Sequence, residues 1–235
     1  MLGAPASTDY DLRFRMLGIP VRVQPWFWVV SAMLGASHAK IEQILIWVVC
    51  VFVSIIVHEF GHGLMAKAFG YAPTIVLYGM GGLCYSDGER QSPGQRLAVL
   101  ICGPVAGFLL AGLIIGGYLA AGRPTLSATG TEVFNDMLFI NIAWGIFNLM
   151  PVWPLDGGQI TAVILTYFSP RHGMRRSHIV SLVAAALLAM LALRLNQIFI
   201  AVFLGLLAFQ NYQILQSIHQ QYAQYGGDDA DWWKR

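Results

Sequence analysis

The chain has 235 residues, of which 57% are hydrophobic and only 11% are Asp, Glu, Lys or Arg. Soluble domains carry about 25% charged and about 45–50% apolar residues, so the composition excludes an ordinary soluble domain and indicates a polytopic membrane protein. A formal net charge of +2 is too small to indicate a nucleic-acid-binding protein, and we expect no nucleic acid among its partners.

Six apolar stretches follow one another along the chain, and most reach the roughly 20 residues that a membrane span needs. The first is short, but Trp26, Phe27 and Trp28 are typical of an anchor at the membrane interface. The pattern predicts an all-α polytopic membrane protein with about six transmembrane helices. The stretches cover residues 25–36, 41–69, 97–121, 133–151, 177–193 and 197–215.

A different pattern separates the second and third stretches. β-Branched and aromatic residues at 74–78 and 83–85 flank Gly79, Gly81 and Gly82, which predicts a small membrane-associated β-hairpin. Residues 87–94 then indicate a polar turn before the third helix. The remaining parts are a cytoplasmic N-terminal segment at 1–22, a single membrane domain at 23–216 and a C-terminal tail at 217–235.

Basic residues are distributed unevenly over the two sides of the membrane. With the N-terminus inside and six spans, eleven lie on the cytoplasmic side and three on the opposite side, as the positive-inside rule requires. We therefore expect both termini in the cytoplasm, and the short loops and basic clusters suit a bacterial inner membrane. If the first stretch does not cross, the basic residues of the N-terminal segment change sides and the bias weakens. The cytoplasmic residues are Arg13, Arg15, Arg22, Lys67, Arg90, Arg96, Arg171, Arg175, Arg176, Lys234 and Arg235; the others are Lys40, Arg123 and Arg194.

The second span contains the sequence His58-Glu59-Phe60-Gly61-His62. Because His58 and His62 are four residues apart, one helix face presents both imidazoles to a single ion. Glu59 lies about 100° further around the helix, where it can reach a metal-bound water without being a ligand. Such a carboxylate takes the proton when water attacks a carbonyl, so the pattern indicates a zinc hydrolase.

The position of this motif within a span strengthens the interpretation. A charge at the centre of a transmembrane helix costs about 2.5–3.5 kcal/mol, and a bound metal compensates for ionisable side chains there. The alternative is a hydrogen-bonded cluster of His58, Glu59 and His62 that holds helices together.

Two histidines leave a tetrahedral site incomplete, so a third ligand is required. Pro151 and Pro154 break the fourth span and expose backbone polar groups, which lipid tolerates only where they line a protein cavity. Asp156 follows this break and is the better candidate, although an N-cap role for it is the alternative. Gly157 and Gly158 allow another segment to approach closely. The remaining histidines lie in predicted loops, at a span end or in the tail: His38, His172, His178 and His219.

The chain resembles the site-2 protease family of intramembrane zinc metalloproteases. The likeness rests on residues 58–62 on one span and on residues 148–158 on a later one, in the order of the family. It extends over about residues 47–168, including Gly103-Pro104. We therefore expect residues 23–216 to form a single intramembrane metalloprotease domain with its core at about 47–168.

The resemblance also implies roles for individual residues. His58, His62 and Asp156 would hold one Zn²⁺, and Glu59 would be the catalytic base. Asn148 would steady the site by hydrogen-bonding the substrate carbonyl or the developing oxyanion.

One family feature is missing, because Gly107 stands where the family often has an asparagine. No PDZ domain fits the 122–132 loop and no CBS pair follows the last span, so we expect a minimal member.

The motif positions place the site towards the cytoplasmic side, at the depth of the hairpin. We hypothesise that the hairpin, through Gly81 and Gly82, holds an unwound substrate segment as an added strand; the alternative is a structural plug. The expected partners are the lipid bilayer and single-span membrane-protein substrates, while a regulatory partner or an oligomer is left open. The alternative functions are a metal or proton transporter and a non-catalytic metal-binding scaffold.

Overall fold

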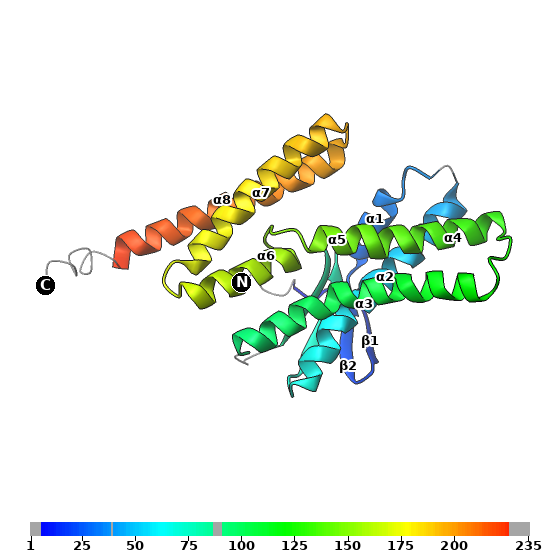
Figure 1. Ribbon diagram of the computed structural model, residues 1–235, viewed down its shortest axis with the longest axis horizontal. Helices are drawn as coiled ribbons and strands as arrows, with labels where there is room; N and C mark the ends of the chain where they lie inside the picture. Colours follow the sequence, from blue (N-terminus) through cyan, green and yellow to red (C-terminus); the bar gives the residue numbers. More distant parts are fainter. Residues whose placement is uncertain (1–5, 39, 87–90, 226–235) are drawn as a thin grey trace, which may run out of the picture. The chain divides into compact units, whose positions relative to one another are not determined.

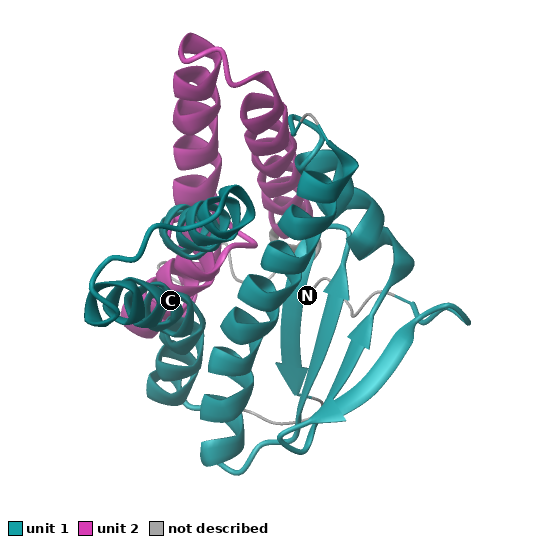
Figure 2. Cartoon of the chain, turned by 90° about the vertical axis from the view of Figure 1, so that its right-hand side faces the viewer, with its two compact units in different colours: residues 1–147 teal, residues 148–235 magenta. Residues whose placement is uncertain are grey.

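The structure is a computed structural model that describes residues 6–38, 40–86 and 91–225 (Figure 1). The chain divides into two compact units, unit 1 at residues 1–147 and unit 2 at residues 148–235 (Figure 2). Part of the predicted polar turn, residues 87–90, and the last ten residues of the predicted tail lie outside the described residues.

Unit 1 combines a β-sheet with helices. Its strands are β1 (Leu12–Met16), β2 (Ile19–Val23), β3 (Pro73–Tyr78) and β4 (Gly81–Ser86). Its helices are α1 (Pro25–Leu34), α2 (Ile41–Ala68), α3 (Pro93–Ala120), α4 (Ala128–Phe139) and the π-helix η1 (Ile140–Trp144). The short helix α5 (Gly145–Asn148) joins unit 1 to unit 2.

The four strands form one sheet in the order β1-β2-β3-β4. The outer pairs are antiparallel hairpins, and the central pair β2–β3 is parallel, with Val21 opposite Ile75 and Val23 opposite Leu77. The predicted hairpin is therefore present as β3–β4, but it is only half of the sheet. β1 and most of β2 lie within residues 1–22, where the sequence predicted no secondary structure.

Alternation along β2 explains how the sheet attaches to the helices. Ile19, Val21 and Val23 point to one face and are at most 2% exposed. This face packs with Ile75 and Leu77 of β3 against a cluster that includes residues of α2. The C-terminal half of α2 therefore packs on the sheet. Buried members of the cluster from α1 and α2 are Phe27, Cys50, Val51, Ile55, Ile56 and Phe60.

Unit 2 contains α6 (Asp156–Phe168), α7 (Gly173–Arg194) and α8 (Ile198–Tyr225). α7 and α8 pack along each other as a helical hairpin (Figure 1). Val152, Ala185 and Leu207 form its small core. Because α8 continues to Tyr225, the first part of the predicted tail is helical.

Four helices among the described residues are long and apolar enough to cross a membrane: α2, α3, α7 and residues 198–220 of α8. α1 has 10 residues, or about 15 Å of helix, which is shorter than the roughly 30 Å of a hydrocarbon core. The stretch at 133–151 runs through α4, η1 and α5 instead of one regular helix. The protein is thus a mostly helical protein with four candidate spans, and the number six stays a prediction.

Candidate metal centre

His58 and His62 lie on α2 and are buried, with 7% and 6% exposure. Their Nε2 atoms are 3.1 Å apart. Two nitrogen ligands of a tetrahedral zinc ion, each about 2.0–2.1 Å from the metal, are about 3.3 Å from each other. The pair therefore fits two ligands of one zinc ion.

A hydrogen bond to α3 sets the tautomer of His62. Its Nδ1 atom lies 2.7 Å from the carbonyl oxygen of Val99, which can only accept. Nδ1 therefore donates, and Nε2 of the neutral ring keeps the lone pair that a metal needs. Such a bond from the distal nitrogen is usual for metal-ligating histidines.

Two glycines allow α3 to approach the motif on α2. A Cβ atom on Gly103 would collide with the imidazole of His62. A Cβ atom on Gly61 would likewise collide with the carbonyl of Cys102. The backbones of α2 and α3 therefore lie close together at this crossing, and this close packing keeps the His62 ring in place.

Glu59 is buried, with 5% exposure, and its side chain lies against strand β4. A Cβ atom on Gly82 would overlap its carboxyl group, so a larger residue there would displace the Glu59 side chain. Burial, and then the negative charge of Glu59, raise the pKa of Tyr78, which pairs with Gly81 across the hairpin. The predicted base thus contacts the edge strand of the sheet.

Asp156 lies in unit 2, where it is the first residue of α6 and is 7% exposed. Leu155 occupies the N-cap position, so the alternative N-cap role does not belong to Asp156. Asn148 ends α5 and is half-buried.

The loop before α6 folds back over the first turn of that helix. A Cβ atom on Gly157 would collide with the Leu149 carbonyl, and one on Gly158 with the backbone of Val152 and Trp153. The segment that approaches Gly157 and Gly158 is therefore the preceding loop of the same chain.

Both backbone groups of Trp153 are held by buried side chains of α7 and α8. The Trp153 amide donates to Ser181 Oγ at 3.0 Å, and Asn211 Nδ2 donates to the Trp153 carbonyl at 2.9 Å. Nδ1 of His178 donates to Asn211 Oδ1 at 2.8 Å. We call Ser181, His178 and Asn211 the Trp153 clamp; all three are at most 3% exposed.

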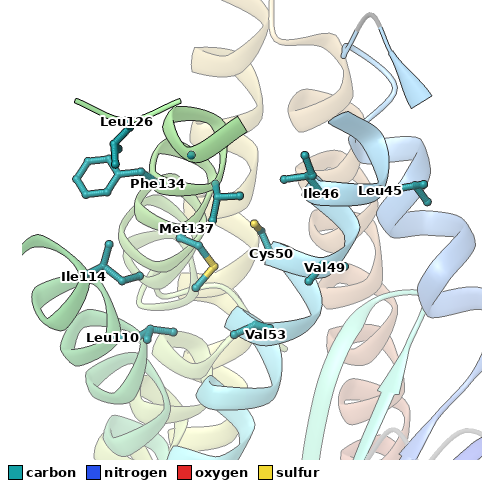
Figure 3. Close-up of a pocket in the computed structure, with 12 residues that line it drawn as sticks. Leu45, Ile46, Val49, Cys50, Val53, Leu110, Ile114, Leu126, Phe134 and Met137 are labelled. Carbon is teal, nitrogen blue, oxygen red and sulfur yellow. The ribbon is translucent and has the colours of Figure 1, made fainter. Parts of the chain in front are cut away.

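A large apolar cavity of unit 1 is separate from this chemistry. It has a volume of about 690 Å³ and lies between α2, α3 and the region of α4 (Figure 3). Apolar side chains line it, among them Val49, Val53, Leu110 and Phe134. It offers no set of metal ligands.

Comparison with known sequences decides the family. The profile of peptidase family M50 matches residues 46–130 and 118–192, which contain both predicted motifs. The chain belongs to peptidase family M50. The resemblance to site-2 proteases noted in the sequence is thereby confirmed.

Relatives within this group include proteins named as zinc metalloproteases. The Synechocystis protein sll0528 is 32% identical over 164 residues, covering 64% of this chain and 42% of the relative. Zinc metalloprotease MJ0392 of Methanocaldococcus jannaschii is 27% identical, covering 72% and 49%. Stage IV sporulation protein FB of Bacillus subtilis is 24% identical, covering 87% and 70%. The chain thus spans about half the length of the first two relatives.

A solved structure shares the fold. The site-2 protease from Methanocaldococcus jannaschii superposes with a TM-score of 0.61 at 24% identity, covering 88% of this chain and 95% of that one. The fold described above is therefore shared with that protein.

The residues of the Trp153 clamp in this M50 member were not predicted from the sequence. No motif joins the three residues, and Asn211 lies beyond the segment that matches the family. Buried polar residues in spans commonly hydrogen-bond between helices, so their positions were the available signal.

Proposed function

We propose that the protein is an intramembrane zinc metalloendopeptidase that hydrolyses peptide bonds within or near transmembrane segments. The observation that carries this proposal is the buried pair of Nε2 atoms on α2, 3.1 Å apart, with Glu59 beside it against an edge strand. α2 is itself long and apolar enough to span a membrane. Membership of peptidase family M50 supports the same activity.

His58, His62 and Asp156 hold one zinc ion per chain in this proposal. Each is a buried side chain of a ligand type that zinc prefers. Three protein ligands leave a fourth position for water or substrate, as catalytic zinc sites require. When bound, zinc supplies a Lewis acid that polarises a carbonyl and acidifies water.

Glu59 moves the proton. Its carboxylate accepts a proton from water as the water oxygen bonds to the peptide carbonyl carbon, and it returns that proton to the amine as the C–N bond breaks. Asn148 donates a hydrogen bond to the substrate carbonyl or to the oxyanion that forms from it. Burial of Glu59 keeps this exchange away from bulk water.

The substrate segment adds to the sheet along β4. β4 is the last strand in the order β1-β2-β3-β4, so one of its sides lacks a partner strand among the described elements. An extended peptide can pair with such an edge, and Gly82 lies against the base. Gly81 and Gly82 therefore contact substrate backbone, and the substrates are single-span membrane proteins.

The charge distribution supports an orientation in the membrane. Both termini lie in the cytoplasm, the site opens towards that side, and the membrane is a bacterial inner membrane. Residues 23–216 form the metalloprotease domain.

Metal content and cleavage, measured together, test the function. We compare purified wild type with Glu59→Gln on a panel of single-span substrates in proteoliposomes. The wild type should bind zinc and cut at least one substrate, whereas Glu59→Gln should keep the zinc and lose cutting by about 10²-fold or more. A Glu59→Gln protein that cuts like the wild type, or a wild type that transports zinc without cutting, would contradict the proposal.

A further inference from the structure

A small cavity lies beside His58 of α2, within unit 1. Its volume is about 10 Å³, and it is separate from the large apolar cavity. Ser54 and His58 of α2, Gly107 of α3 and Asn141 of η1 line it, together with Ile55, Ile140, Trp144 and Gly145.

Asn141 lines this cavity, and one atom of its side chain has no hydrogen-bond partner. Its Nδ2 donates to Ser54 Oγ at 2.8 Å and to the Met137 carbonyl at 2.7 Å. Because the Met137 carbonyl can only accept, this orientation of the amide is required. Oδ1 is left without a hydrogen-bond partner, although the residue is only 3% exposed.

Such a buried acceptor needs an explanation, since most buried polar atoms in proteins are hydrogen-bonded. A cavity of about 10–15 Å³ holds one water molecule if two or more polar groups face it. Asn141 Oδ1 and a lone pair of Ser54 Oγ provide two such groups. Asn141 also lies in η1, and π-helical turns often mark functional positions.

We propose that this cavity binds a single structural water, held by Asn141 Oδ1 and Ser54 Oγ against the His58 ring. Asn141 is then a positioning residue for His58, acting through the water. The effect on metal binding rests on the proposed function, because it requires His58 to be a zinc ligand. The presence of the water does not depend on the proposed function.

Gly107 provides the space for this water. A Cβ atom there would lie 3.5 Å from Asn141 Oδ1, which is an ordinary contact. Gly107→Ala should therefore fold but fill the cavity, while Gly107→Ser should fill it with a hydroxyl that can donate to Oδ1 in place of the water. Gly112→Ala on the same helix is the matched control, because its Cβ would meet no described atom within 4 Å.

The test measures zinc affinity by competition with a chelator for the purified full chain. Asn141→Leu and Gly107→Ala should each weaken zinc binding by about tenfold, as loss of a partner outside the metal's own ligands typically does. Gly107→Ser should stay within about threefold of wild type, and Gly112→Ala should equal it. Wild-type affinity in Gly107→Ala, equal losses in Gly107→Ala and Gly107→Ser, or a loss in Gly112→Ala would each overturn the inference.

A high-resolution structure of the metal-free protein gives a second, independent readout. Wild type should show one water within about 3 Å of Asn141 Oδ1, and Gly107→Ser should show its hydroxyl there. Absence of that water in wild type would overturn the inference even if the protein is a zinc protease. Its presence in a protein that binds no zinc would contradict the proposed function and leave the water site standing.

Discussion

Asn211 donates a hydrogen bond of 2.9 Å from Nδ2 to the carbonyl oxygen of Trp153, 58 residues earlier in the chain and three residues before Asp156. The same amide donates to the Leu207 carbonyl, and its Oδ1 accepts from His178. A side chain on the last helix thus fixes the backbone that leads into the proposed third ligand.

Loss of this bond should weaken the metal site. Asn211→Asp keeps the acceptor for His178 but removes both Nδ2 donors, so the Trp153 carbonyl loses its partner. We expect zinc affinity to fall by about tenfold, measured by chelator competition. Gln213→Leu, an exposed position on the same helix, should have no effect. If Asn211→Asp binds zinc as tightly as the wild type does, the Trp153 clamp does not contribute to metal binding.

Gly82→Ala should block the base without removing the metal. The added Cβ would overlap the Glu59 carboxyl group and displace it. We expect cleavage to fall by about 10²-fold or more at unchanged zinc content. Gly79→Ala is the control in the same hairpin, since its Cβ would make only ordinary contacts, at 3.5 Å from Val30. Equal cleavage by both variants would show that β4 does not constrain Glu59.

Gly103→Ala should act on the metal instead. Its Cβ would collide with the His62 imidazole, so the ring must move from its position beside His58. Zinc content should fall below half of the wild-type value, as measured by elemental analysis. Gly116 lies on the same helix, and a Cβ atom there would meet no described atom within 4 Å. Gly116→Ala should therefore keep the zinc content of the wild type. Similar zinc in both variants would contradict the packing described at this crossing.

Acid should weaken the sheet through Asp11. Its carboxylate accepts from the Thr8 hydroxyl, and Arg22 of β2 donates to it at 3.0 Å; these contacts lower its pKa below the ordinary 3.8. A lowered folded-state pKa stabilises the fold above about pH 4, and that contribution is lost as pH falls through the folded value. Thermal unfolding from pH 7 to pH 3 should therefore depend less on pH in Asp11→Asn. The exposed Asp9→Asn should follow the wild type; identical curves for all three would exclude the contribution.

Local patterns in the sequence predicted the elements that carry the chemistry. Histidines at 58 and 62 in one apolar run, and a Gly-rich turn between β-forming residues, suffice to predict a ligand pair on α2 and the β3–β4 hairpin. The first strands were missed, although Ile19, Val21 and Val23 alternate with other residues. Their parallel partner β3 lies about 50 residues away, and no local sequence pattern predicts such a pairing.

The supporting residues of the site could not be predicted for a related reason. The roles of Asn141 and Asn211 depend on which helix packs beside each of them. Gly82 was predicted to contact substrate, and Gly103 belongs to the family pattern, but their contacts with Glu59 and His62 depend on how α2 packs. The broken fourth stretch was foreseen at its prolines but not in η1, because a π-helix leaves no composition signal.

Zinc stoichiometry across three proteins tests the central claim most directly: wild type, Glu59→Gln and Asp156→Ala, purified identically and measured by elemental analysis. We predict about one zinc per chain for wild type and for Glu59→Gln, and less than half for Asp156→Ala, because two histidines alone leave the tetrahedral site incomplete. Full zinc in Asp156→Ala would exclude it as the third ligand. Loss of zinc in Glu59→Gln would contradict its assignment as a base that does not bind the metal.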